Sequence, residues 1–339
     1  MAQEIVRIGH SDLTARMFGV CDAYVKEIES AFGVDVRNRA ESTGDAVLVT
    51  GESAEAVRLA AIVLERLREE AGRVEEIPEQ RVTYLIGMVR DGRSEELTVL
   101  DDSAICVTSR GKPVRAKTVG QRKYVNAITK NTIVLGVGPA GTGKTFLAVA
   151  MAVKALRSGE VSRIVLTRPA IEAGEKLGFL PGDLQSKIDP YLRPLYDALY
   201  EMLGAENYAR MAEKQVIEVA PLAYMRGRTL DDSFIILDEA QNATPEQMKM
   251  FLTRLGFRSK VVVTGDLTQT DLPTGQKSGL AMAVKILEGI DDIYIHRFTD
   301  KDVVRHKLVQ QIILAYERHD RERMQKRVQG GKKSEEMSR

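Results

Sequence analysis

The eight residues from Gly138 to Thr145 have the types and spacing of a phosphate-binding loop. They match the pattern G-x-x-x-x-G-K-[ST]. Their glycines allow the backbone conformations in which successive N–H groups face one anion. The Lys144 ammonium can then reach the β- and γ-phosphates, and the Thr145 hydroxyl can bind Mg²⁺. The residues expected to hold a nucleotide are Gly138, Pro139, Ala140, Gly141, Thr142, Gly143, Lys144 and Thr145.

Two adjacent acids supply the second element of nucleotide chemistry. Asp238 and Glu239 directly follow the apolar run 234–237. A carboxylate at the position of Asp238 would hold Mg²⁺ through water, and Glu239 would orient and deprotonate the attacking water. Such a pair can also be no more than the polar end of a strand. The phosphate-binding loop upstream favours the catalytic interpretation.

Two glutamines complete the predicted site. Gln269 follows the apolar run 261–263 and the polar residues after it, where its amide can sense a γ-phosphate. Gln121 lies upstream of the loop and is expected to read the adenine edge, because an amide both donates and accepts hydrogen bonds. The expected cofactors are therefore ATP and Mg²⁺.

The elements around these residues predict how they are positioned. The β-branched run 132–137 before the loop reads as a buried strand, and the stretch 146–157 after it as a helix. Further apolar runs separated by helical stretches predict a parallel sheet covered by helices on both faces. The fold class is thus α/β, a P-loop NTPase with a RecA-like sheet. The runs are 163–167, 217–219, 234–237, 260–264 and 293–295.

The chain of 339 residues is long enough for two domains. Residues 1–80 are expected to form a small β-α-β-β-α domain, with helices over 13–32 and 53–70. Residues 81–116 are interpreted as a linker or β-arm, with a plain connecting hairpin as the alternative. The ATPase domain is placed at 117–319, and 320–339 is expected to be a basic, disordered tail.

Charge is distributed unevenly along the chain. Residues 1–80 hold 9 Lys/Arg and 16 Asp/Glu, a net charge of −7, whereas the whole chain is at +1. The β-α-β-β-α segment resembles a KH-type RNA-binding domain, which grips phosphates with a GXXG loop. Here the corresponding residues, Gly19-Val20-Cys21-Asp22, end in an acid. An acid repels phosphate, so we expect docking or assembly from this domain in preference to direct RNA binding.

Composition also indicates the compartment of the protein and limits the membrane and metal-binding classes to which it can belong. The two cysteines, Cys21 and Cys106, do not make a disulfide framework and fit a reducing compartment. The first residues lack a signal-peptide pattern, and no apolar stretch has the length of a membrane span. A cytoplasmic protein without a membrane partner is expected. The four histidines are scattered, so no metal other than nucleotide-bound Mg²⁺ is predicted.

The motifs together resemble a known family. The loop, Asp-Glu-Ala-Gln at 238–241 and Gly-Asp-Leu-Thr-Gln at 265–269 resemble the first motor domain of superfamily-one helicases. Further motifs extend the resemblance over roughly residues 75–318 and are similar to those of PhoH-like proteins. They are Thr167-Arg168-Pro169-Ala170, the stretch 175–182, Asp189-Pro190-Tyr191, the stretch 225–229 and Asp302-Val303-Val304-Arg305-His306. The resemblance implies a cytoplasmic ATPase, linked to RNA and to an endoribonuclease in RNA processing.

Several arginines are candidates for completing the site. Superfamily-one helicases use an arginine from a second motor domain, and about 20 residues follow His319 here. We therefore expect a ring-shaped, head-to-tail homo-oligomer in which a neighbour supplies the arginine. Arg305 can instead sense γ-phosphate in its own subunit, and Arg168 is expected on RNA; surface salt bridges are the alternative for each. The candidates for the shared arginine are Arg226, Arg228, Arg297 and Arg305.

Two functions remain open from the sequence. The first is an Mg²⁺-dependent ATPase that remodels RNA, with Lys144, Asp238, Glu239 and Gln269 at its centre. The second is a nucleotide-gated oligomeric adaptor that recruits an endoribonuclease without unwinding RNA. Tyrosines 191, 196 and 200 can stack on bases, although their spacing fits helix packing as well and we favour packing.

Overall fold

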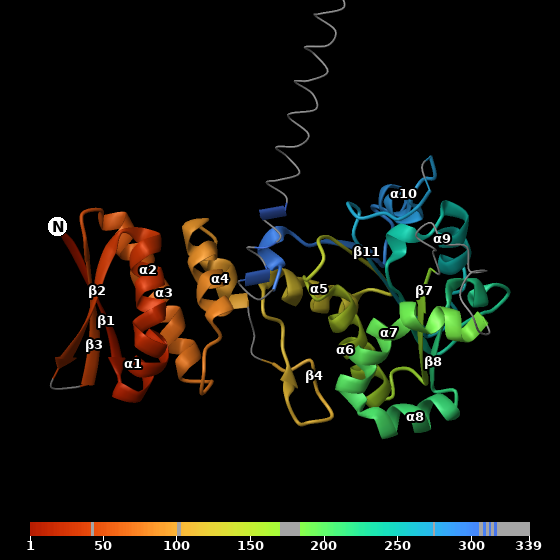
Figure 1. Cartoon of the computed structure of the whole chain (residues 1–339), viewed down its shortest axis with the longest axis horizontal. Coiled ribbons are helices and arrows are strands. Elements are labelled where there is room, and N and C mark those ends of the chain that lie inside the picture. Colours follow the sequence, from red (N-terminus) through yellow and green to blue (C-terminus); the bar gives the residue numbers. More distant parts are fainter. Residues whose placement is uncertain are drawn as a thin grey trace, which may run out of the picture. The chain divides into compact units, whose positions relative to one another are not determined.

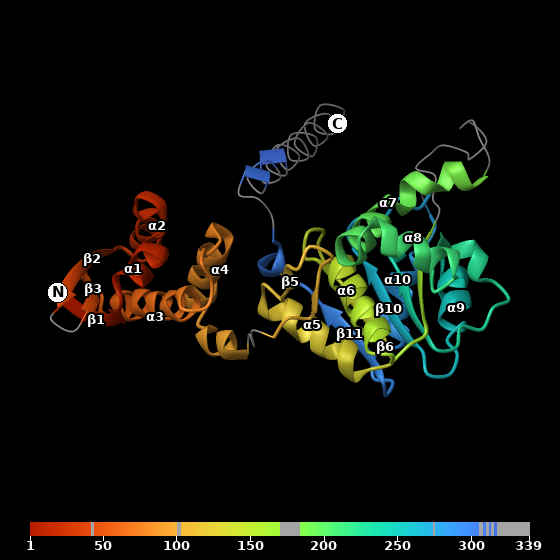
Figure 2. The ribbon, with the colours of Figure 1, turned by 90° about the horizontal axis from the view of Figure 1, so that it is seen from below.

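The computed structural model describes residues 1–41, 44–99, 103–169, 184–273 and 275–304, together with 308, 309, 312, 315 and 316. The described residues divide into two compact units, one that includes Met1–Arg90 and one of Asp91–Val303. Figures 1 and 2 show both units from two directions. The second unit contains the P-loop and all five of the apolar runs predicted to be strands after it.

The first unit is a three-stranded antiparallel sheet covered by helices. The strand order is β1-β3-β2, so that β2 and β1 are the two edges. Helix α3 packs against β1 and the shorter helices, and the helices lie on one side of the sheet in Figure 1. The elements are β1 (Ala2–Gly9), α1 (Ser11–Phe18), α2 (Ala23–Phe32), β2 (Val34–Glu41), β3 (Gly44–Gly51), α3 (Ala54–Ala71) and α4 (Glu79–Arg90).

The single helix predicted over 13–32 is wrong, because two helices meet there at a sharp break. Gly19 ends α1, with a φ of 72°. Cys21 and Asp22 follow in left-handed conformations, with φ values of 54° and 57°. A Cβ on Gly19 would lie 2.8 Å from the Tyr24 ring, so glycine is required where the chain turns. The apolar pattern hides the break because Met17 and Ile28 both face the core.

The linker or β-arm predicted at 81–116 begins instead as helix α4. Its buried residues include Val82, Leu85, Ile86 and Val89, whose spacing has the helical period, and they pack towards α3. A short 3₁₀ helix, η2 (Ser94–Val99), follows in the second unit. The strands β4 (Cys106–Val107) and β5 (Pro113–Val114) then pair as a small antiparallel hairpin, which agrees with the alternative of a connecting hairpin.

The second unit confirms the predicted α/β fold. Six parallel strands lie in the order β11-β6-β10-β9-β7-β8. One core joins the sheet to α5, α6 and α7, and another joins it to α9 and α10. The elements are α5 (Val119–Lys130), β6 (Ile133–Val137), α6 (Lys144–Arg157), β7 (Arg163–Arg168), α7 (Leu184–Leu203), α8 (Ala205–Glu213), β8 (Ile217–Pro221), β9 (Ser233–Leu237), α9 (Pro245–Leu252), β10 (Lys260–Gly265), α10 (Gly279–Ile286) and β11 (Ile293–Arg297).

Parallel pairing brings the polar strand ends together. The central strands β6, β10 and β9 are almost wholly buried, as expected for a sheet with helices on both faces. Their carboxyl ends carry the P-loop, Gly265 and Asp238, all at one edge of the sheet. Within the part of the chain that the structure describes, no helix has the length and apolarity to cross a membrane.

Candidate nucleotide-binding site

The P-loop joins β6 to α6 and is tied to the neighbouring strand. Gly138, Gly141 and Gly143 all have positive φ values, of 147°, 85° and 79°. The Gly138 N–H donates to the carbonyl of Gly265 at the end of β10, at 3.1 Å. A Cβ on Gly138 would lie 2.7 Å from the Cβ of Phe298, so this position has no room for a side chain. The glycines thus let the loop close tightly over the sheet edge.

Lys144 lies across the loop that precedes it. Its ammonium donates to the carbonyls of Gly138 and Pro139, at 2.7 Å in each case. The side chain is mostly buried although it carries a charge. Lys144 is also the first residue of α6, so its charge adds to the positive end of the helix dipole. The loop therefore offers an anion site of backbone N–H groups and one ammonium.

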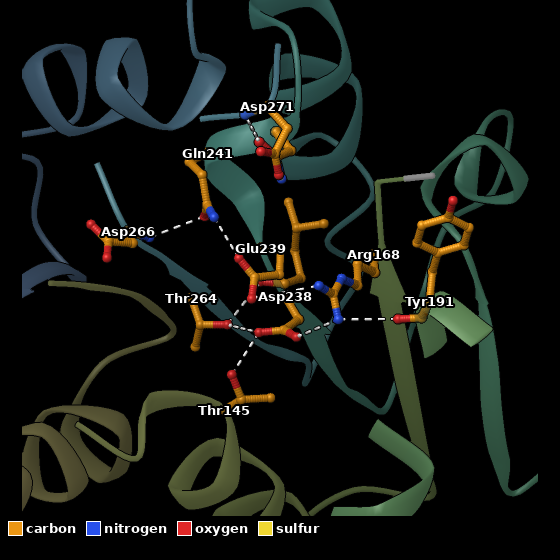
Figure 3. Close-up of polar contacts among 11 residues, drawn as sticks. Thr145, Arg168, Tyr191, Asp238, Glu239, Gln241, Thr264, Asp266 and Asp271 are labelled. Carbon is orange, nitrogen blue, oxygen red and sulfur yellow. Dashed lines mark hydrogen bonds and ion pairs between the residues drawn. The ribbon is translucent and has the colours of Figure 1, made fainter. Parts of the chain in front are cut away.

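Asp238 is held beside the P-loop by two hydroxyl groups (Figure 3). Thr145 Oγ1 donates to Asp238 Oδ1 at 2.6 Å, and Thr264 Oγ1 donates to the same oxygen at 2.8 Å. The Asp238 side chain is almost fully buried. A hydroxyl and a carboxylate at this separation are the hard oxygen ligands that suit Mg²⁺. Thr145 and Asp238 thus fit the metal role that the sequence predicts.

Glu239 is held from both sides of its carboxylate. Its backbone has a φ of 49°, which turns the chain into the 3₁₀ helix η5 (Ala240–Asn242). Gln241 Nε2 donates to Glu239 Oε2, and Arg168 Nη2 lies 3.5 Å from Oε1. Gln241 Oε1 in turn accepts the Asp266 N–H at 3.0 Å. The predicted base is therefore linked to the ends of β7 and β10.

Most of the predicted residues line one cleft. P-loop residues line it together with Asp238, Glu239, Asp266 and Gln269. The cleft has a volume of about 290 Å³, near the lower end of the usual range for ligand pockets of roughly 300–1,000 Å³. Among the described residues it is lined by Ala140, Gly141, Gly143, Lys144, Thr145, Phe146, Asp238, Glu239, Gly265, Asp266 and Gln269.

Gln121 supports the loop from behind. It is 4% exposed, and both ends of its amide are bonded within the chain. Its Oε1 accepts the Lys117 N–H at 2.7 Å, and its Nε2 donates to the Thr142 carbonyl at 3.0 Å. The side chain is thus placed to fix the P-loop backbone. The adenine contact predicted for Gln121 stays a prediction.

Aromatic residues under the loop have shifted acidities. Tyr124 is fully buried beside Gly136, and its hydroxyl donates to the Lys144 carbonyl at 3.4 Å. Burial raises the pKa of the Tyr124 phenol, with the Asp238 charge adding to it. The His296 ring lies 5.5 Å from that of Tyr124, and burial lowers its pKa to about 4. Both rings are therefore uncharged at neutral pH and serve as packing under β6.

The other predicted arginines lie away from the cleft or outside the described residues. Arg228 makes two bonds of 2.6 Å to the Glu218 carboxylate, and Arg297 lies 3.3 Å from Glu288. Arg226 is exposed. None of these three is among the described residues that line the cleft. Arg305 falls outside the described residues.

Arg168, which the sequence predicts to contact RNA, lies beside the two acids in the structure. Its guanidinium lies 3.9 Å from Asp238 Oδ2 as well as 3.5 Å from Glu239, and it donates to the Tyr191 carbonyl at 3.0 Å. The signal in the sequence is its position, because Arg168 directly follows the predicted strand 163–167, whose end must meet the edge of the sheet that carries the site. Tyr196 and Tyr200 contact each other and Tyr208, which agrees with packing.

Comparison with known proteins places this geometry in a family. The family model for PhoH-like proteins matches residues 113–317. A PhoH-like protein of Bacillus subtilis strain 168 is 49% identical over 314 residues, which are 93% of this chain and 97% of that protein. A PhoH-like protein of Mycobacterium tuberculosis strain H37Rv is 54% identical over 312 residues, 91% of this chain and 86% of that one.

A more distant relative and one solved structure complete the comparison. Protein PhoH of Escherichia coli strain K12 is 44% identical over 233 residues, 68% of this chain and 61% of that protein. The Sulfolobus solfataricus SWI2/SNF2 ATPase core in complex with dsDNA aligns with a TM-score of 0.28 and 16% identity, over 42% of this chain and 31% of that one. At that score the likeness carries no weight for this chain. The family match and the close relatives show that the chain belongs to the PhoH-like proteins.

Proposed function

We propose that this chain is an Mg²⁺-dependent ATPase that acts on or with RNA. The observation that carries the proposal is the 2.6 Å hydrogen bond between Thr145 and Asp238. It joins the loop that would bind phosphate to the strand that would hold the metal. A PhoH-like P-loop fold with these two groups in contact has the parts needed to bind a magnesium nucleotide.

Each residue of the cleft has a role in the proposed hydrolysis. The P-loop N–H groups and Lys144 bind the phosphates, and Thr145 and Asp238 hold Mg²⁺, which would neutralise charge on the transferred phosphoryl group. Glu239 accepts the proton of the attacking water, and Gln241 and Arg168 hold its two oxygens. Gln269, which lines the same cleft, senses the γ-phosphate. Hydrolysis then depends on positioning and charge, not on a covalent intermediate.

The first unit supports a link to RNA and limits what that link is. Its order up to α3 is β-α-α-β-β-α, with α4 after it, and the turn between the first two helices is at Gly19–Asp22, where a KH domain has its GXXG loop. Asp22 places a negative charge in that turn. We therefore assign a docking role to this unit and place RNA contact on the ATPase unit. Because Cys21 and Cys106 are free thiols, we also place the protein in a reducing, cytoplasmic compartment.

The adaptor function remains the second proposal. Of the arginines predicted to act from a neighbouring subunit, Arg226 is exposed and Arg297 is exposed with a partner on its own chain. A head-to-tail homo-oligomer would bring such a residue to the next subunit's cleft. ATP binding would then set the shape of an assembly that recruits an endoribonuclease.

An ATPase assay with and without RNA, followed by strand displacement on an RNA duplex, tests these functions. The wild-type chain should hydrolyse ATP only with Mg²⁺, and Glu239→Gln should strongly reduce both hydrolysis and any unwinding. ATP-dependent binding of an endoribonuclease that survives in Glu239→Gln, without unwinding by the wild type, would favour the adaptor. Absence of Mg²⁺-dependent ATP binding would refute both.

A further inference from the structure

Arg168 joins the catalytic acids to helix α7. It is the last residue of β7, and it contacts Asp238, Glu239 and the Tyr191 carbonyl of α7. We propose that Arg168 is the positioning residue of the general base: it fixes the Glu239 carboxylate for proton abstraction and is itself anchored on α7. This inference rests on the proposed ATPase function. It differs from the sequence-based expectation that Arg168 contacts RNA.

Strand pairing places Arg168 next to the acids. In the parallel register of β7 and β9, Thr167 pairs with Leu237. The residues that directly follow this pair are Arg168 and Asp238. Ile164 and Leu166 of β7 and Ile236 of β9 belong to the core on the α6 side of the sheet. Because strand side chains alternate, Arg168 and Asp238 both point to this side, where the P-loop helix begins. Figure 3 shows the guanidinium directed towards both carboxylates.

The contacts around Glu239 are those of a clamp. Arg168 lies at Oε1 and Gln241 donates to Oε2, so the two oxygens have partners from different elements. The Arg168 side chain is mostly buried, with 21% of its surface exposed, so its charge is only partly screened by water. A planar guanidinium directs its donors rigidly, whereas a lysine acts as a point charge. Removing Arg168 would therefore free the base to rotate away from the attacking water.

Arg168 is bonded to a main-chain carbonyl of α7 in a turn that contains two prolines. Pro190 and Pro194 both lie inside α7, on either side of Tyr191. Pro194 has no N–H to donate to the carbonyl four residues earlier, that of Pro190, so one helical hydrogen bond is missing in the turn that contains Tyr191. Arg168 donates to the Tyr191 carbonyl at 3.0 Å at the same place. A shift of α7 would therefore move Arg168 and change the orientation of Glu239.

The test is a double-mutant cycle on the full-length chain without RNA. Arg168→Gln and Arg168→Lys are made in the wild type and in Glu239→Gln, and kcat, KM for Mg·ATP and the affinity for a non-hydrolysable ATP analogue are measured. Arg168→Gln should lower kcat by about 10–100-fold and leave KM within about threefold, with partial recovery in Arg168→Lys. In the Glu239→Gln background it should cause no further loss, because both changes remove the same step.

A control variant and the results below distinguish failure of this inference from failure of the proposed function. Arg258→Ala breaks the ion pair with Asp232 at the opposite edge of the sheet and should leave kcat unchanged. The inference is overturned if the losses of kcat from Arg168→Gln and Glu239→Gln multiply in the double variant, or if Arg168→Gln loses affinity for the ATP analogue together with kcat. It is also overturned if Arg168→Gln has wild-type turnover without RNA and reduced turnover only in a parallel assay with RNA. Full activity in Glu239→Gln would remove Glu239 as the base and with it this inference, whereas absence of Mg²⁺-dependent hydrolysis in the wild-type chain would instead refute the proposed function. Retained analogue binding by Arg168→Gln shows that the variant is folded.

Discussion

The Thr145 hydroxyl donates to Asp238 Oδ1 at 2.6 Å, although 93 residues separate the two in the sequence. Thr145 lies in the first turn of α6, and Asp238 follows the last residue of β9. The bond therefore measures how closely the P-loop helix approaches the acidic strand end. A second hydroxyl, that of Thr264, reaches the same oxygen from β10 at 2.8 Å.

The two threonines should differ in their effect on metal binding. Thr145→Val removes a metal ligand that faces the cleft. The factor by which Mg²⁺ increases the affinity for ATP should therefore be at least about tenfold smaller than in the wild type, with the affinity without metal little changed. Thr264→Val leaves the metal ligands but removes a buried hydrogen bond, so the free energy of unfolding should fall by about 1–2 kcal/mol. Binding of a fluorescent ATP analogue, titrated at several Mg²⁺ concentrations, measures the first effect. Unfolding in urea measures the second. Equal loss of metal dependence in both variants would contradict the assignment.

Glu239→Gln should separate binding from hydrolysis. The amide keeps the shape of the side chain but cannot accept the proton of water, so turnover should fall by about 10²–10⁴-fold while ATP affinity is retained. Steady-state phosphate release and equilibrium binding measure these quantities. Glu288→Gln, which changes an exposed acid paired with Arg297, is the control and should hydrolyse ATP normally. A variant at 239 that hydrolyses ATP at the wild-type rate would remove Glu239 as the base.

Gln121→Ala should weaken the binding of all nucleotides to the same extent. The change leaves the Thr142 carbonyl and the Lys117 N–H without their bonds to the amide, which loosens the P-loop without changing any base contact. A loss of about 1–1.5 kcal/mol corresponds to roughly tenfold weaker binding of both ATP and GTP. Competition binding with the two nucleotides measures the ratio, and Gln276→Ala at an exposed glutamine is the control. A loss confined to ATP would support the adenine contact predicted from the sequence.

His296 should make the fold sensitive to acid. Burial holds its folded pKa at about 4, with Asp302 opposing this shift and Lys123 adding to it. The unfolded imidazole has a pKa of about 6.5, so between these values only the unfolded chain binds the proton. The free energy of unfolding should therefore rise with pH through this window and fall by up to about 3 kcal/mol as the pH drops from about 6.5 to about 4.

The variant His296→Phe isolates this contribution. His296 is 6% exposed, its Nε2 has no hydrogen-bond partner among the described residues, and its ring packs on Phe298. A phenyl ring keeps this packing but loses the hydrogen bond that His296 makes with the Gly120 backbone, so the test reads the pH dependence of unfolding and not its absolute value. Urea unfolding between about pH 4 and about pH 7 should show a shallower pH dependence in this variant than in the wild type. The exposed His10→Gln serves as control and should keep the wild-type slope. Identical slopes in His296→Phe and the wild type would refute the prediction.

Local sequence predicted most of the ATPase unit. The P-loop pattern, the apolar strands and the alternation with helices each depend on a few neighbouring residues. Since parallel strands end at the same edge of a sheet, the positions of Asp238 and Gln269 in the sequence sufficed to place them on one cleft with Lys144. Helix boundaries were harder to predict. The break at Gly19 lies inside a continuous apolar pattern, and the prediction of an arm at 81–116 misses the helical spacing of the apolar residues in α4.

By itself, therefore, the sequence determined the chemistry available: a phosphate loop, two acids and the strands that carry them. Tertiary structure alone decided the partners of two polar side chains. Gln121 donates to Thr142 because α5 packs behind the loop, and Arg168 meets Glu239 because β7 lies next to β9 in the sheet. The physical reason is that residue spacing specifies which edge or face a side chain occupies. Which partner that side chain contacts there depends on strand order and helix packing, and these are set by burial over the whole unit.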